Sequence, residues 1–179
     1  SLLHRDSDSL LELCEGFKSV QIAISIDAMG DQHDYWRQKG TWDIVWKNTL
    51  EIEKWVHTQS NADMKIRTAI AWPNAYAARD VFDAFADKLS NNKVSHVWNL
   101  VNIPEGLDLN QLSQDTLDKL TTWWSKYPDV AHMFSKIKPI EDNRYAQEWK
   151  SHLGIRYDNW HKNNFVDAFP EFKEFYNGL

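Results

Sequence analysis

The sequence predicts an α/β protein in which about three parallel strands are followed by a helical C-terminal region. Three short segments rich in β-branched residues are each followed by a segment with helical spacing of apolar residues. This alternation recurs about every 30–40 residues, which is typical of βα units with right-handed crossovers in a parallel sheet. Beyond Pro104 only helical patterns remain. We therefore expect a βα region over residues 1–110 and a helical extension over residues 111–179.

The first strand belongs to the stretch FKSVQIAISIDAMGDQHDYWR, residues 17–37. Its β-branched residues alternate with small or polar ones, a pattern that fits a strand packed on both faces: Val20, Ile22, Ile24 and Ile26. Ser25 and Asp27 then fall at the carboxyl end of the strand, where α/β folds usually place ligand chemistry. Residues 30–37 are expected to form a turn before a helix begins.

Two further βα units are expected after this turn. A helix from Trp42 to about His57 has Thr41 as its N-cap and one apolar face. The second strand is predicted over residues 64–72 and its helix over residues 75–89, with Asn74 as the N-cap. The third strand is predicted over residues 94–103, after a polar turn at residues 90–93.

The C-terminal third is predicted to be helical, without a β-hairpin. Helices are expected over residues 110–127 and 141–153, the second ended by Gly154. Residues 130–137 fit either a short helix or an irregular turn. Residues 158–176 are expected to be mostly helical, with Pro170 near the start of a final helix.

Composition excludes several classes of protein. The chain has 179 residues, a hydrophobic content of 42% and a charged content of 26%, which are ordinary for a globular domain. A net charge of −6 argues against a dedicated nucleic-acid surface, and no apolar run is long enough for a membrane span. The single cysteine, Cys14, excludes an internal disulfide and fits a cytoplasmic location. Most of the ten tryptophans are expected to be packing groups.

Known catalytic and metal-binding motifs are missing from the sequence. The seven histidines are scattered and show neither H-E-x-x-H nor a Cys/His zinc spacing. The sequence also has no G-x-S-x-G, Walker or G-x-G-x-x-G motif. Cys14 lies in the helix that precedes the first strand, where a packing role is favoured over a nucleophilic one.

The end of the first strand carries the strongest candidates for ligand binding. A hydroxyl, a carboxylate and a guanidinium, from Ser25, Asp27 and Arg37, suit a small zwitterionic ligand that contains ribose. The alternative is structural: Asp27 as a cap or turn residue, and Arg37 in a surface ion pair with Asp34 or Asp31. Arg67 either faces a lumen or points outward, and the outward position is favoured.

Later strands add weaker candidates. Thr68, Ile70 and Trp72 could flank an adenine ring, although packing inside the fold is favoured for them. Asn99 and Asn102, at the end of the third strand, could face a substrate, and turn formation is an equal alternative.

Several stretches resemble the radical S-adenosylmethionine enzymes, particularly those with a SPASM or shortened twitch C-terminal region. The matching residues at the first strand are Ser25-Ile26-Asp27-Ala28, His33-Asp34-Tyr35-Trp36-Arg37 and Gly40-Thr41-Trp42, with Ala28 where the family often has glycine. Residues 97–104, VWNLVNIP, resemble a late barrel strand with its loop. The tail, residues 157–160 and 169–172, resembles the family ending LD-x-x-R…PEL, with His161 near the position of the usual arginine.

The resemblance implies a partial (β/α) TIM-like barrel that contributes to an S-adenosylmethionine site. Ser25 would reach the ribose and Arg37 the methionyl carboxylate, with Asp27 and Thr68 in the same site and Asn99 and Asn102 on the substrate side. In such enzymes a [4Fe–4S] cluster and the cofactor together generate a 5′-deoxyadenosyl radical. Substrates of related enzymes include peptides, nucleotides and small molecules.

The cluster is where this chain departs from the family. Three thiolates, usually spaced C-x3-C-x2-C, hold three irons of the cluster, and one cysteine cannot do so. We therefore expect the C-terminal part of such an enzyme, with the N-terminal half of the barrel as its missing partner. Alone, it is expected to hold neither the cluster nor the cofactor and to be inactive.

Two other classes of function remain open. The first is a non-catalytic α/β binding or scaffold module that kept the fold and lost the redox centre. The second is an ordinary α/β enzyme, which would have a pocket at the strand ends enclosed by this chain alone.

Overall fold

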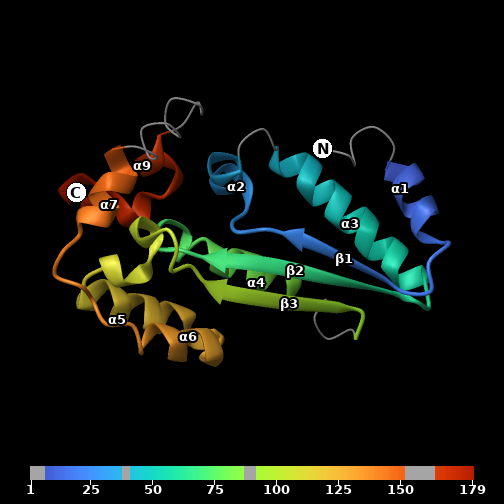
Figure 1. The fold of residues 1–179 in the computed structure, drawn as a ribbon. Coiled ribbons are helices and arrows are strands. Elements are labelled where there is room, and N and C mark those ends of the chain that lie inside the picture. The colour runs from blue at the N-terminus through green and yellow to red at the C-terminus, as the bar shows by residue number, and fades with distance from the viewer. Residues whose placement is uncertain (1–6, 38–40, 87–91, 152–163) are drawn as a thin grey trace.

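The computed structural model describes residues 7–37, 41–86, 92–151 and 164–179. Its centre is a three-stranded parallel sheet in the order β1-β2-β3, which confirms the predicted α/β class (Figure 1). The strands are β1 (Val20–Ser25), β2 (Ala62–Ile70) and β3 (Val94–Leu100). The sheet does not close into a barrel, and β1 and β3 are its edge strands within the described part of the chain.

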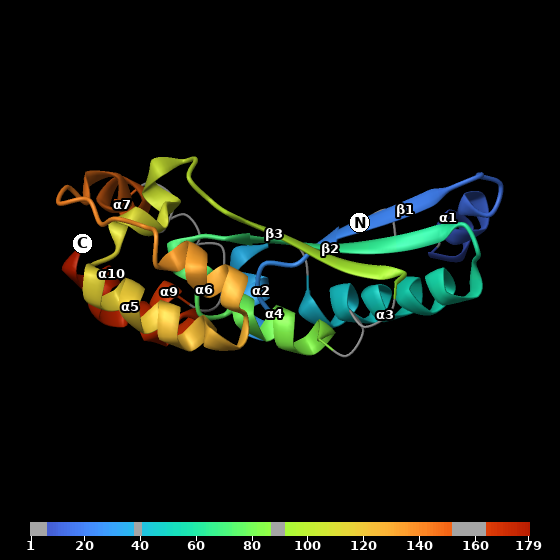
Figure 2. The same ribbon diagram turned by 90° about the horizontal axis from the view of Figure 1, so that it is seen from below.

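Helices cover one side of the sheet. Figure 2 shows α2 (Gly30–Trp36), α3 (Trp42–Thr58) and α4 (Ala78–Phe85) below the strands, while α1 (Ser7–Cys14) precedes β1. The prediction of α3 is confirmed, and α4 occupies the middle of its predicted segment after a 3₁₀ turn, η2 (Trp72–Asn74). The prediction of a turn over residues 30–37 was wrong, because α2 fills that segment.

The C-terminal region lies beyond the carboxyl ends of the strands (Figures 1 and 2). It consists of short helices and 3₁₀ turns: η3 (Glu105–Leu107), η4 (Leu109–Gln111), α5 (Gln114–Trp123), η5 (Trp124–Lys126), α6 (Pro128–Phe134), α7 (Arg144–Trp149), α9 (Phe165–Ala168), η7 (Pro170–Phe172) and α10 (Lys173–Gly178). The helical prediction is confirmed, although α5 and α7 are shorter than expected. Residues 152–163, including Gly154, lie outside the described residues.

Two hydrophobic cores hold the molecule together. The strand core lies between the sheet, α3 and the second half of α4, and includes Ile52, Met64, Ile66 and Phe85. The helical core joins the carboxyl ends of the strands to α5–α10 and is rich in aromatic rings. β2 contributes to both cores, because Ile66 belongs to the first and Ile70 to the second.

Trp72 is the centre of the helical core. Its side chain is fully buried and contacts Trp149, Phe165 and Phe172, with ring centroids 5.2–5.6 Å apart. Its indole Nε1 donates a hydrogen bond of 2.7 Å to the carbonyl oxygen of Gly106. Trp72 is therefore a packing group that attaches the C-terminal helices to the end of β2.

Across the described ranges, every helix is too short or too polar to span a bilayer.

Candidate functional site

The side of the sheet opposite the helices is polar and accessible. We call it the uncovered face, and it consists of alternate residues of the three strands: Gln21, Ala23 and Ser25 of β1, Asp63, Lys65, Arg67 and Ala69 of β2, and Ser95, Val97 and Asn99 of β3. All those of β1 and β3, and Arg67, are exposed. The intervening residues, such as Met64 and Ile66, are fully buried toward the helices. Parallel sheets are normally covered on both sides, so this face is unusual.

The strand register arranges the uncovered face in rows. Arg67 lies between Ser25 on β1 and Val97 on β3. Two residues earlier along β2, Lys65 lies between Ala23 and Ser95. Neighbouring strands are about 4.8 Å apart, so hydroxyl groups flank both cations. Arg67 is exposed on this side of the sheet beside Ser25, and a solvated outward position is the one that the sequence favoured.

The carboxyl end of β1 is fixed by the side chain of Asp27. Asp27 is 3% exposed, and its Oδ1 accepts a hydrogen bond of 2.8 Å from the backbone N–H of Ala69. The amide of Asn74 completes this connection: Nδ2 donates to the carbonyl oxygens of Asp27 (2.7 Å) and Ala69 (2.9 Å), and Oδ1 accepts from the N–H of Ala71. Where β1 ends, side-chain hydrogen bonds from Asp27 and Asn74 therefore take the place of backbone hydrogen bonds between β1 and β2.

Arg37 pairs with Asp27 rather than with Asp31 or Asp34. Its Nη2 lies 2.5 Å from Asp27 Oδ2, and α2 connects the two residues. The Asp27 side chain is 5% exposed, whereas that of Arg37 is 43% exposed. Because a guanidinium has five N–H donors, Arg37 keeps donors for a further anion at the edge of the sheet.

Thr68 lies on the helix-covered side, away from Ser25. Its hydroxyl is buried and donates to the carbonyl oxygen of Ile26 (2.8 Å), and it lies 2.8 Å from His96 Nε2. Since the Thr68 proton points to Ile26, His96 donates from Nε2, and its Nδ1 has no hydrogen-bond partner among the described residues. Burial lowers the pKa of His96 from 6.5 to about 4.

The structure brings together part of the predicted site. Ser25 and Asn99 share the uncovered face, and Asp27 and Arg37 form an ion pair at its edge. Asn102 is exposed in the loop after β3. Sequence reasoning missed the roles of Lys65 and Asn74. The strand alternation that buries Met64 and Ile66 also places Lys65 on the uncovered face, whereas Asn74 acts over 47 residues and has no local signal.

The described residues do not fit an iron–sulfur cluster. Cys14 is a free, half-buried thiol in α1, and one thiolate cannot hold three irons. No group of three or more His, Cys, Asp or Glu side chains in the described ranges could hold a metal ion. Ser25, in contrast, has an exposed hydroxyl that makes no hydrogen bond to another described residue and is open to a ligand.

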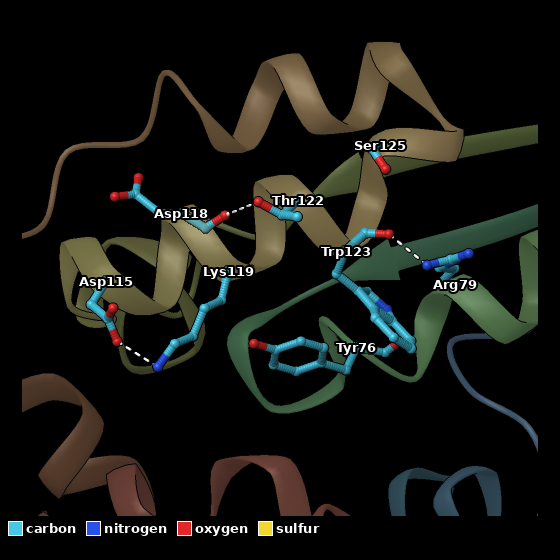
Figure 3. A pocket seen from close by; sticks show the side chains of 8 residues that line it. All are labelled: Tyr76, Arg79, Asp115, Asp118, Lys119, Thr122, Trp123 and Ser125. Atoms are coloured by element: carbon cyan, nitrogen blue, oxygen red, sulfur yellow. Dashed lines mark hydrogen bonds and ion pairs between the residues drawn. The ribbon is translucent and has the colours of Figure 1, made fainter.

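A separate hollow of about 600 Å³ lies beside α5 (Figure 3). Its cations are already engaged: Lys119 pairs with Asp115 at 2.6 Å, and Arg79 donates to the carbonyl oxygen of Trp123 and covers its ring. The hollow is open and its lining comes from η2–α4 and α5–η5 rather than from the strand ends. It does not have the form expected of an enclosed active site.

The uncovered face and the strand end therefore offer three cations, several hydroxyl and amide groups and a firmly held carboxylate, which together suit an anionic or zwitterionic ligand. Comparison with protein-family models, with curated proteins and with solved structures found no match to this chain.

Proposed function

We propose that this chain forms part of the (β/α) barrel of a radical S-adenosylmethionine enzyme and contributes one wall of its cofactor and substrate site. The uncovered face is the observation that carries the proposal. A barrel wall has helices outside and a lumen inside, and here helices cover only one side of three parallel strands. The residue matches around Ser25 and Arg37 supply the choice of family.

Two side chains would hold the cofactor. Ser25 would accept a hydrogen bond from a ribose hydroxyl through its side-chain oxygen, and Arg37 would use its remaining N–H donors for the methionyl carboxylate. Asp27 and Asn74 act as positioning residues, because they fix the strand end and the guanidinium. Thr68 would contribute by holding Ile26 in place, since its hydroxyl is engaged on the covered side. Asn99 and Asn102 would face the substrate.

The cluster thiolates would come from polypeptide outside this sequence. The cluster would supply the radical chemistry, whereas this chain would bind and orient the cofactor and the substrate. The location would be cytoplasmic, in keeping with an oxygen-sensitive centre.

The test begins with the coding sequence upstream of Ser1. We expect a C-x3-C-x2-C loop about 60–100 residues earlier, the length of two to three βα units. The extended polypeptide, reconstituted with iron and sulfide and reduced, should produce 5′-deoxyadenosine from S-adenosylmethionine. Ser25→Ala should weaken cofactor binding at least about fivefold through loss of one hydrogen bond.

Two outcomes would contradict the proposal. One is an extended polypeptide that binds a cluster and forms no 5′-deoxyadenosine. The other is the 179-residue chain binding four irons and cleaving the cofactor alone. A chain that lacks an upstream cysteine loop would favour a non-catalytic α/β module.

A further inference from the structure

The centre of the uncovered face is positively charged in a protein that is acidic overall. Lys65 and Arg67 project from the central strand, whereas the whole chain has a net charge of −6. Neither residue forms an ion pair with a carboxylate in the described ranges. The acidic group on this face, Asp63, lies two residues before Lys65 along β2 and accepts a hydrogen bond of 2.9 Å from Gln21. Within the described residues the two cations therefore take part in no ion pair, and they outnumber the one carboxylate on this face.

Hydroxyl donors flank these cations on both edge strands. Ser25 lies beside Arg67 in the register, and Ser95 lies beside Lys65. Residues two apart along a strand are about 6.6 Å apart, so the long side chains of Lys65 and Arg67 can converge on one small group. Ala23, opposite Lys65, leaves room for that group.

A phosphate group matches this arrangement better than a carboxylate. At neutral pH a phosphomonoester has a charge near −2 and three strong acceptor oxygens. Arginine binds it through two parallel N–H bonds, while lysine acts as a point charge. Two cations and two hydroxyl donors would balance both the charge and the acceptors of one phosphate, whereas a carboxylate has one negative charge.

We propose that Lys65 and Arg67, with Ser25 and Ser95 beside them, form a subsite for the phosphate group of a small-molecule substrate. This inference rests on the proposed function and specifies its substrate class: a phosphomonoester such as a nucleotide or a sugar phosphate, bound in the lumen by its phosphate. Arg67 orients the phosphate, and Lys65 neutralises its charge.

The test is a titration of the 179-residue chain, followed by amide NMR at constant ionic strength. The probes are inorganic phosphate, adenosine 5′-monophosphate, adenosine, acetate and a glutamate-rich peptide. Phosphate and the nucleotide should shift the amide signals of β1, β2 and β3 around residues 23–25, 65–67 and 95, and adenosine and acetate should not. Binding of the nucleotide should weaken between pH 7.5 and pH 5.5, because its phosphomonoester loses its second charge near pH 6.

Matched variants identify the residues responsible. Arg67→Gln and Lys65→Gln should each weaken binding of the nucleotide at least about tenfold, the effect of losing one strong hydrogen bond to a charged group. Lys54→Gln removes the same charge from an exposed position on α3, and its affinity should equal that of the unchanged chain. Thermal unfolding of the three variants, all changed at positions outside the cores, checks that each remains folded.

Equal weakening in all three variants would overturn the proposal, because it would show a general charge effect. Equal binding of acetate and phosphate would also overturn it, and so would tighter binding of a glutamate-rich peptide, which would identify an acidic protein segment as the occupant. The phosphate titration and the assay for 5′-deoxyadenosine test the two proposals independently. The phosphate subsite can fail while the extended polypeptide still forms 5′-deoxyadenosine, and the reverse result would contradict the proposed function alone.

Discussion

Single side chains hold the carboxyl ends of β1 and β2 together. The Asn74 amide makes three hydrogen bonds, and the Asp27 carboxylate joins the backbone of β2 to the guanidinium of Arg37. Asn74 is fully buried, and its partners Asp27 and Ala71 are buried with it. The position of Ser25 on the uncovered face therefore depends on residues that do not themselves face that side.

Asn74→Ala should destabilise the protein by about 2–4 kcal/mol, because it leaves one buried carbonyl oxygen, one part-buried carbonyl oxygen and one buried N–H unpaired. The midpoint of urea unfolding measures the change. Asn99→Ala is the matched control, since Asn99 is exposed and its loss should change the stability by less than about 0.5 kcal/mol. Equal effects of the two substitutions would show that the strand end is not held by Asn74.

His96 should make the stability depend on pH. Its pKa is lowered from 6.5 to about 4 by burial, so the unfolded chain binds the proton more readily than the folded one. Neutral His96 contributes fully to the free energy of unfolding above about pH 6.5. This contribution is lost as the pH falls toward about 4, and it amounts to roughly 3 kcal/mol at most. Burial also lowers the pKa of His33, which acts in the same direction.

His96→Gln should reduce this loss, because glutamine can donate to Thr68 and does not take up a proton. Urea unfolding between pH 7.5 and pH 4 would show a smaller fall in the midpoint than in the unchanged protein. Thr68→Val distinguishes the effect of the hydrogen bond to His96 from the effect of His96 protonation. It should lower the stability at every pH, and the stability should still fall over the same pH range. An unchanged slope in His96→Gln would contradict the assignment.

The ion pair between Asp27 and Arg37 shows what local sequence can and cannot reveal. Each residue was identifiable as a site candidate from its place at a strand end. Their contact depends on α2, which returns the chain to the sheet edge within ten residues, and the sequence predicted a turn there. Asn74 was expected to cap a helix. Its hydrogen bond to Asp27 connects residues that are far apart in the sequence, so the residues next to Asn74 do not indicate it.

Among the elements, strands were predicted more accurately than short helices. β1 follows from period-two alternation, which tertiary packing reinforces, and β2 and β3 follow from the recurrence of strand and helix segments along the chain. The helix α2 has only seven residues, several of them polar, and is stabilised by burial of His33 and Tyr35 rather than by an apolar stripe. The predicted helix over residues 110–127 is divided in the structure, because Asp108 and Ser113 each cap a separate segment, η4 and α5.

Contact between η3 and α7 requires glycine at position 106. A β-carbon there would lie 2.9 Å from the β-carbon of Trp149 and closer still to the carbonyl oxygen of Tyr145. Gly106→Ala should therefore destabilise the protein by about 1–3 kcal/mol through steric overlap. A shift of the thermal midpoint to lower temperature would measure this effect.

Gly178→Ala provides the comparison for this prediction. Apart from its chain neighbours and the backbone of α10, no heavy atom of the described residues lies within 4 Å of a β-carbon built at Gly178, which ends α10. Alanine is the better helix former, so this substitution should leave the midpoint unchanged or raise it slightly. Similar losses at both positions would mean that close packing against α7 is not the cause.

At the scale of the whole molecule, the sequence predicted the sheet and the helical region, but it did not predict that one face of the sheet is exposed to solvent. Alternation of strands and helices gave the parallel sheet, and the loss of alternation after Pro104 gave the helical region. The uncovered face was not predictable, because Ala23 and Ser25 suited a strand packed on both sides. Whether a second layer exists depends on contacts across the molecule, which the pattern of one strand does not contain.

Because β2 belongs to both hydrophobic cores, neither core can open without exposing part of it. It is also the central strand, with hydrogen-bonded neighbours on both sides. Deuterium should therefore enter the backbone amides of residues 62–70 last, and those of α1 and α10 first. Mass spectrometry of peptic fragments after timed labelling would measure this order, and early labelling of β2 would mean that the two cores separate along it.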